Sequence, residues 1–97
     1  LLEPILKMTI VIPNEFVGDV MSNISKHRGL VGEFSVEGEN QVITAEIPQI
    51  ELSKCVVELK TLTQAQADIT HEFLRYAEVP REQAEKIIAE YKAAHAN

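Results

Sequence analysis

The sequence predicts one α+β domain of the split βαβ kind, in which four antiparallel strands form a sheet and two helices cover one face. Two observations predict it. Segments with apolar residues at every second position alternate with segments whose apolar residues recur at helical spacing, in the order β-α-β-β-α-β followed by one more helix. With 97 residues and 45% hydrophobic content, the chain can bury one core but is too short for two.

The first strand is marked by strict alternation. Leu6, Met8, Ile10 and Ile12 share one face of it, and Pro13 ends it. Such alternation is typical of an antiparallel sheet with one buried face.

The first helix is predicted over residues 15–28. Asn14 is placed to cap its N-terminus and Gly29 to stop it. A basic run at residues 26–28 precedes this glycine, where cations meet the negative end of the helix. The apolar stripe of the helix is Phe16, Val17, Val20, Met21 and Ile24.

A hairpin follows, with strands at residues 30–37 and 41–47 around a turn at residues 38–40. Pro48 closes the second strand, and a second helix is predicted over residues 50–62. Its apolar stripe is Leu52, Cys55, Val56, Leu59 and Leu62.

The fourth strand is predicted at residues 67–76, with Ile69, His71 and Phe73 on one face. A third helix starts at Pro80. This element order is the ferredoxin-like arrangement. Both helices that cover the sheet are expected to pack on the face that carries Ile10, Ile43 and Phe73.

Net charge limits the partners of the chain. Nine Lys and Arg against fifteen Asp and Glu give −6 at pH 7. Nucleic-acid affinity that is independent of sequence comes from cations that neutralise phosphates, so the chain as a whole is repelled by RNA and by anionic membranes. Any RNA contact therefore needs a local basic patch held in place by a larger assembly.

The compartment is indicated by cysteine usage and hydropathy. Cys55 is a single cysteine, which fits a reducing environment, and no apolar run approaches the roughly 20 residues that span a bilayer. A charged start followed by an apolar signal core is also missing. We expect a cytoplasmic protein.

Catalytic and nucleotide-binding motifs are not found. The four glycines are scattered, none precedes a Lys-Ser or Lys-Thr pair, and no carboxylate pair stands out as an acid–base couple. We therefore expect no catalytic, cofactor-binding or metal-binding residue. His71 is interpreted as a sheet-face histidine and Cys55 as a buried thiol, while a ligand or acid–base role for His71 and a reactive Cys55 beside Lys54 stay as alternatives.

The basic run has two interpretations. Lys26, His27 and Arg28 can stabilise the helix C-terminus through its dipole, by about 0.3 to 1 kcal/mol each, or they can contact a partner. Spacing favours the capping role. The same alternatives apply to Lys60 at the end of the second helix.

Short segments spread along the chain resemble, in the same order, the C-terminal domain (domain V) of bacterial elongation factor G, the GTPase that drives ribosomal translocation. The resemblance covers residues 1–89, and the collinear order makes it specific although each segment alone is weak. The segments are Leu1-Leu2-Glu3-Pro4, Pro13 to Val20, His27-Arg28-Gly29, Ala45 to Pro48, Leu59 to Gln64, and Glu72-Phe73 with Glu78 to Arg81.

The resemblance implies a single domain over residues 1–97, with a junction from a preceding domain at 1–4, a core at 5–76 and a C-terminal helix at 80–94. It implies a module that orients the factor on the large ribosomal subunit, against ribosomal RNA and the stalk-base protein. GTP and magnesium would belong to an N-terminal GTPase domain of the parent protein. The candidate ribosome-contacting residues are Lys26, His27, Arg28, Lys54, Lys60, Gln64 and Gln66.

The chain departs from the family pattern at two places. Ala65-Gln66-Ala67 and Asp68 replace a glycine-flanked, cationic turn and a common serine, and Lys54-Cys55 replaces a Gly-Tyr pair. A flexible cationic loop has thus become stiffer and locally acidic. These departures indicate a divergent paralogue, whose role in translocation, recycling or ribosome protection stays open.

An alternative function from another class is a regulatory ferredoxin-like module that binds a small molecule or dimerises through its sheet. The sequence offers no set of convergent polar residues for such a ligand. The open sheet face, with Val11, Val42 and Leu74, is expected to pack on a neighbouring domain of the parent, or to support dimers of an isolated fragment.

Overall fold

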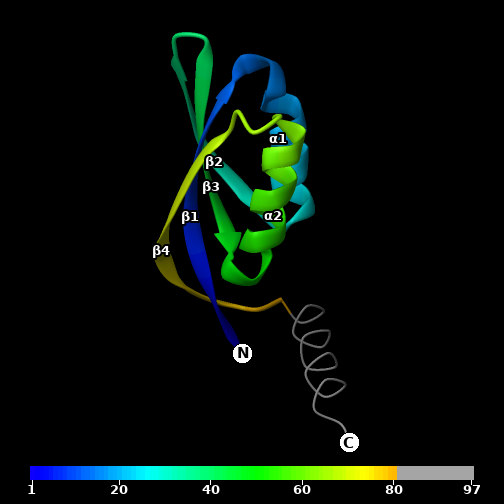
Figure 1. The fold of residues 1–97 in the computed structure, drawn as a ribbon. Coiled ribbons are helices and arrows are strands. Elements are labelled where there is room, and N and C mark those ends of the chain that lie inside the picture. Colours follow the sequence, from blue (N-terminus) through cyan, green and yellow to red (C-terminus); the bar gives the residue numbers. More distant parts are fainter. Residues whose placement is uncertain (81–97) are drawn as a thin grey trace, which may run out of the picture.

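Four antiparallel strands form one sheet, and two helices lie on one of its faces (Figure 1). The structure is a computed structural model that describes residues 1–80, and the helix expected beyond Pro80 lies outside the described residues. The elements are β1 (Leu2–Pro13), the 3₁₀ turn η1 (Asn14–Phe16), α1 (Val17–Lys26), β2 (Leu30–Glu37), β3 (Asn40–Pro48), α2 (Gln49–Leu62) and β4 (Asp68–Glu78).

The strand order is β2-β3-β1-β4, and all three pairings are antiparallel. β1 lies between β3 and β4, so that Ile10 faces Ile43 on one side and Ile69 on the other. Both βαβ connections therefore skip one strand, which is the split βαβ topology. The predicted ferredoxin-like fold is confirmed.

The core lies between the sheet and the two helices. Alternate residues of β1 and β3 point into it, as the period of two predicts, and α1 and α2 supply the other side. Burying one such Ile or Leu side chain contributes about 1.5 to 3 kcal/mol. The buried cluster is Leu6, Met8, Ile10, Ile12, Val20, Ile24, Ile43, Ala45, Ile47, Cys55, Leu59 and Ala67.

Phe73 is an exception to the predicted packing face. It pairs with the buried Leu6, yet it remains 56% exposed. β4 is an edge strand of the described sheet, and Ile69, four residues earlier, is the β4 side chain that packs against the core. The Phe73 ring instead meets the ring of Tyr76 edge-on at 5.3 Å between centroids. The expectation that both helices cover Phe73 was wrong.

The start of the first helix also differs from the prediction. Asn14 makes no side-chain cap; it begins η1, and its backbone N–H donates to the carbonyl of Glu39 at 3.1 Å. The α-helix proper starts at Val17, again without a side-chain cap. The backbone N–H of Asn14 thus ties the start of η1 to the hairpin turn, and the predicted side-chain cap by Asn14 was wrong.

Strand β1 begins earlier than expected. Leu2, Glu3 and Pro4 pair with β4 opposite Glu78, Ala77 and Tyr76, and the N–H of Val79 donates to the carbonyl of Leu1 at 2.9 Å. Residues 2–4, within the segment expected as a junction from a preceding domain, therefore belong to strand β1.

Helix α1 ends in a Schellman motif. The N–H of Gly29 donates to Ile24 at 2.8 Å and the N–H of Arg28 donates to Ser25 at 3.2 Å. Arg28, at φ 64°, takes the left-handed position that usually selects glycine. Gly29 is needed for a different reason, because a Cβ there would collide with the Ile24 side chain and lie 2.8 Å from its carbonyl oxygen.

Helix α2 ends in the same way but with two left-handed residues in succession, Gln64 at φ 54° and Ala65 at φ 65°. The N–H of Ala65 donates to Lys60 at 2.7 Å. Thr63, fully buried, holds the turn: its hydroxyl donates to the Leu59 carbonyl at 2.7 Å and accepts the N–H of Ala67 at 3.1 Å. The turn is thus fixed by hydrogen bonds despite its non-glycine residues.

We expect Gly29→Ala to destabilise the fold by about 1 to 3 kcal/mol, because the added methyl group overpacks the end of α1. Gly18→Ala is the matched control: its Cβ meets nothing within 4 Å, and alanine favours a helix by up to about 1 kcal/mol over glycine. Urea unfolding midpoints measure both. Equal midpoints for the two variants would contradict the close approach at Gly29.

Candidate functional site

A cluster of polar side chains joins the end of α1 to α2. We call it the α1–α2 polar cluster: Asn23, Lys26, His27, Glu51 and Glu58. His27 lies at its centre and is 5% exposed. Its Nδ1 lies 3.0 Å from Oε2 of Glu51, and its Nε2 lies 2.9 Å from Oε2 of Glu58.

The two contacts of His27 define its chemistry. A carboxylate oxygen only accepts, so both ring nitrogens donate at once when the imidazole carries two protons. Both ring nitrogens contact carboxylates that are seven residues apart on α2, so the ring fastens the end of α1 to two positions on that helix.

Three side chains, those of Asn23, Lys26 and His27, lie within hydrogen-bond distance of the Glu58 carboxylate. The side-chain amide of Asn23 donates to its Oε1 at 2.9 Å, and the ammonium of Lys26 does so at 3.1 Å. Lys26, then Asn23, and to a lesser degree His27 hold the pKa of Glu58 below its ordinary value. Glu58 is therefore a carboxylate at neutral pH.

Cys55 lies beneath this cluster. Its thiol is fully buried and donates to Oδ1 of Asn23 at 3.5 Å. Burial, with a smaller contribution from Glu58 and Glu51, raises the pKa of Cys55 to about 11. The thiol stays protonated, as expected for a buried thiol and contrary to a nucleophile activated by Lys54.

Arg28 forms a two-point ion pair with Glu3 of β1. Its Nη2 and Nη1 donate to Oε2 and Oε1 of Glu3 at 2.5 and 3.3 Å, and the pair is largely buried. Arg28, a candidate ribosome-contacting residue, therefore does not project from the end of α1 into solvent. The left-handed turn at Arg28 directs the guanidinium toward the first strand instead.

The basic run thus turns inward. Of its three side chains, Lys26 remains 67% exposed while it pairs with Glu58, and the others lie against carboxylates of α2 and β1. These side chains therefore stabilise the end of α1 through specific pairs with α2 and β1, in addition to their effect on the helix dipole. An external partner would find Lys26 most accessible.

The remaining candidate residues lie elsewhere on α2 and in the turn that follows it. Lys54, Gln64 and Gln66 are exposed, and the ammonium of Lys60 donates to the carbonyl of Ala67. Lys26 and His27 both contact Glu58, which lies two residues before Lys60 on α2. The seven candidates therefore lie beside α2, along it and in the turn after it, and they differ in accessibility, because His27 is buried and Arg28 is paired with Glu3.

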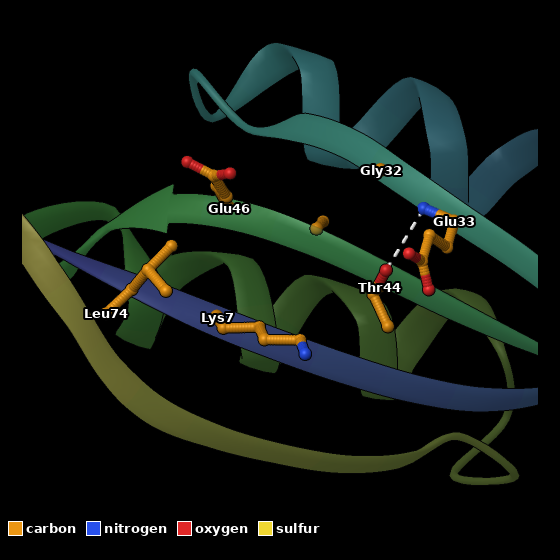
Figure 2. Close-up of a pocket in the computed structure, with 7 residues that line it drawn as sticks. Lys7, Gly32, Glu33, Thr44, Glu46 and Leu74 are labelled. Atoms are coloured by element: carbon orange, nitrogen blue, oxygen red, sulfur yellow. Dashed lines mark hydrogen bonds between the residues drawn. The ribbon is translucent and has the colours of Figure 1, made fainter.

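The open face of the sheet carries a shallow depression of about 250 Å³ (Figure 2). Thr44 lies on its floor and accepts the N–H of Glu33 at 3.0 Å. Polar residues dominate the face, and Glu46 there pairs with Arg75. The depression is lined by Lys7, Gly32, Glu33, Thr44, Ala45, Glu46 and Leu74.

His71 lies exposed on β4, as a sheet-face histidine would. Within residues 1–80, no group of three or more His, Cys, Asp or Glu side chains is arranged to hold a metal ion. Neither described helix has the length and apolar content that crossing a bilayer would require.

A family model described as the elongation factor G C-terminus matches residues 1–87. The chain belongs to this family. It is also similar to a crystal structure of a protein from Thermus thermophilus, with a TM-score of 0.83 and 38% sequence identity. The match covers 92% of this chain but 14% of that protein, so the chain spans a small part of its relative's length.

Four residues of this elongation factor G C-terminal domain escaped the sequence-based prediction: Glu3, Asn23, Glu51 and Glu58. Asn23 lies beside Ile24 on the buried side of α1. Because a buried amide needs a hydrogen-bond partner, this position was the sequence signal that could have identified Asn23. Glu51 and Glu58 are seven residues apart on α2, hence on one helix face. Nothing local connects Glu3 to Arg28, which are 25 residues apart.

Glu58→Gln should lower stability at neutral pH and lose that effect in acid. Because the folded-state pKa of Glu58 is lowered, its contribution is present above the ordinary glutamate pKa and disappears as pH falls through the folded-state value. Urea unfolding from about pH 7 to pH 3 measures the difference from the native sequence. Glu37→Gln, on the exposed end of β2, is the control. A difference that stays constant with pH would refute the role of the Glu58 charge.

The Cys55 thiol should react slowly in the native domain. A pKa of about 11 instead of 9.0 leaves about a hundredfold less thiolate at pH 8, and burial slows access further. A chromogenic disulfide reagent, added with and without denaturant, measures the rate. Similar rates in both conditions would show that the thiol is accessible in the folded state.

Proposed function

We propose that this domain contacts the large ribosomal subunit on behalf of a translational GTPase of the elongation factor G type, and orients that factor during elongation. The observation that carries the proposal is the family match over residues 1–87. The small share of the Thermus protein that is matched fits a module of a larger chain. GTP hydrolysis, with magnesium, would then belong to a separate N-terminal domain, and the factor would work in the cytoplasm.

The side chains of the domain support action by contact. His27 has both nitrogens engaged with carboxylates, and Cys55 is protonated and buried. Among the described residues, every buried side-chain nitrogen or oxygen has a hydrogen-bond partner. These groups rigidify the fold and leave recognition to the surface.

The accessible candidates for ribosomal contact are Lys26, which pairs with Glu58 of α2, Lys54 and Lys60 on α2, and Gln64 and Gln66 in the turn after it. With a net charge of −6, the domain needs such local cations together with contacts made by the rest of the factor. His27 and Arg28 would act indirectly, by fixing the end of α1.

The alternative, a module that binds a small ligand, has less support. The depression on the open face is shallow, and its polar side chains include Glu46, which pairs with Arg75, and Thr44, which accepts a backbone N–H. A ligand site usually offers polar groups that converge on an enclosed space.

Adding positive charge to the turn after α2 tests whether this turn contacts ribosomal RNA. In the full-length factor, Gln66→Arg with Asp68→Ser adds two units of positive charge beside the ribosome. Each added phosphate contact should steepen the dependence of log affinity on log salt by about 0.9, with tighter binding at low salt. Sedimentation with ribosomes across a salt series measures both.

The control is Glu72→Gln with Glu78→Gln on β4, which changes net charge by the same two units away from α2. If the turn variant matches the native factor in affinity and salt slope, this turn does not face RNA. A coding sequence upstream without a phosphate-binding GTPase loop would contradict the proposal as a whole.

A further inference from the structure

The β2–β3 hairpin is an acidic projection at one end of the sheet (Figure 1). Between Arg28 and Lys54 the chain has no Lys or Arg, while Glu33, Glu37 and Glu39 lie on the hairpin. These three glutamates are exposed. Gln66, in the turn after α2, lines a hollow together with Glu39 and Asn40 at the tip of the hairpin, but strand β2 itself carries none of the candidate ribosome-contacting residues.

The outer edge of β2 has no neighbour among residues 1–80. In the order β2-β3-β1-β4, β2 pairs with β3 on one side, and its other side is open. Backbone N–H and C=O groups along an open edge form a template for another strand. The last described residues, Val79 and Pro80, follow β4 at the opposite edge of the sheet.

Side chains alternate along the segment that we call the β2 edge surface, residues Glu33 to Glu37. Phe34 and Val36 pair with Ile43 and Gln41 and point to the helix side, where they remain 48% and 66% exposed. Glu33, Ser35 and Glu37 point to the open side. An acidic row and an apolar row therefore run along the two faces of one free strand.

This pattern selects the occupant. A strand that alternates apolar and basic residues would place valine-like side chains beside Phe34 and Val36 and cations beside Glu33 and Glu37. A second copy of the chain is disfavoured, because antiparallel self-pairing about Ser35 sets Glu33 of one copy against Glu37 of the other. RNA is disfavoured because its phosphates would meet carboxylates.

We propose that the β2 edge surface binds an extended, basic segment of a partner protein, which adds to the sheet as a fifth strand. Main-chain hydrogen bonds would supply affinity, and the two rows of side chains would supply register and selectivity. The proposal goes beyond ribosomal contact by α2 and holds whether or not that contact is made.

The experiment titrates the isotopically labelled 97-residue chain with a capped seven-residue peptide that alternates valine with lysine and arginine. NMR should show amide shift changes along β2 and slowed amide exchange on its outer edge, with β4 unaffected. Shift changes that centre on β4 or α2 would overturn the proposal.

Variants test the two rows separately. Glu33→Lys with Glu37→Lys should weaken peptide binding by about tenfold or more, since two attractive cross-strand pairs become repulsive. Glu72→Lys with Glu78→Lys, the same change of net charge on β4, should leave affinity within about twofold. Val36→Ser should weaken binding about threefold without changing the charge. Equal weakening by both lysine pairs would mean that net charge alone attracts the peptide.

Two further probes complete the test. A peptide of the same composition with its valines grouped together should bind at least about fivefold more weakly, because strand alternation is lost. Equal affinity for that peptide, or binding of a short single-stranded RNA at the same β2 amides, would overturn the proposal.

Discussion

The register of β1 is the constraint on which the rest of this domain depends. β1 is bounded by β3 and β4, and its alternate residues Leu6, Met8, Ile10 and Ile12 are buried beneath both helices. A slip of one residue would turn this apolar row to the open face. The same register places Glu3 beside Arg28, so the first strand also fixes where α1 ends.

Periodicity was sufficient to predict the architecture because it records which side of each element is buried. The alternation of β1 and the stripe of α1 required the faces that the structure shows. Phe73 is an exception. Its position in an alternating strand predicts which face of the sheet it lies on, but not whether a helix extends far enough along β4 to cover it.

The site was less predictable than the fold because its pairs are distant in sequence. His27 meets Glu58 across 31 residues and Arg28 meets Glu3 across 25, and no local pattern encodes either meeting. A basic run before a glycine looks the same whether its cations face solvent or carboxylates. In a chain with more acidic than basic residues, pairing these cations with carboxylates compensates the charge on both partners. The functional proposal therefore rests on the family match and not on side-chain patterns.

The bond between the Val79 N–H and the Leu1 carbonyl has a mechanical consequence. Residues 1 and 79 lie side by side at the ends of two antiparallel strands. Tension applied between them would break the hydrogen bonds between β1 and β4 one after another. Strands loaded in this geometry yield at lower force than strands loaded in shear, because the bonds break in sequence and not together. Tension between residues 1 and 79 would thus separate β4 from β1 before it disturbed the helices, which pack on β1 and β3.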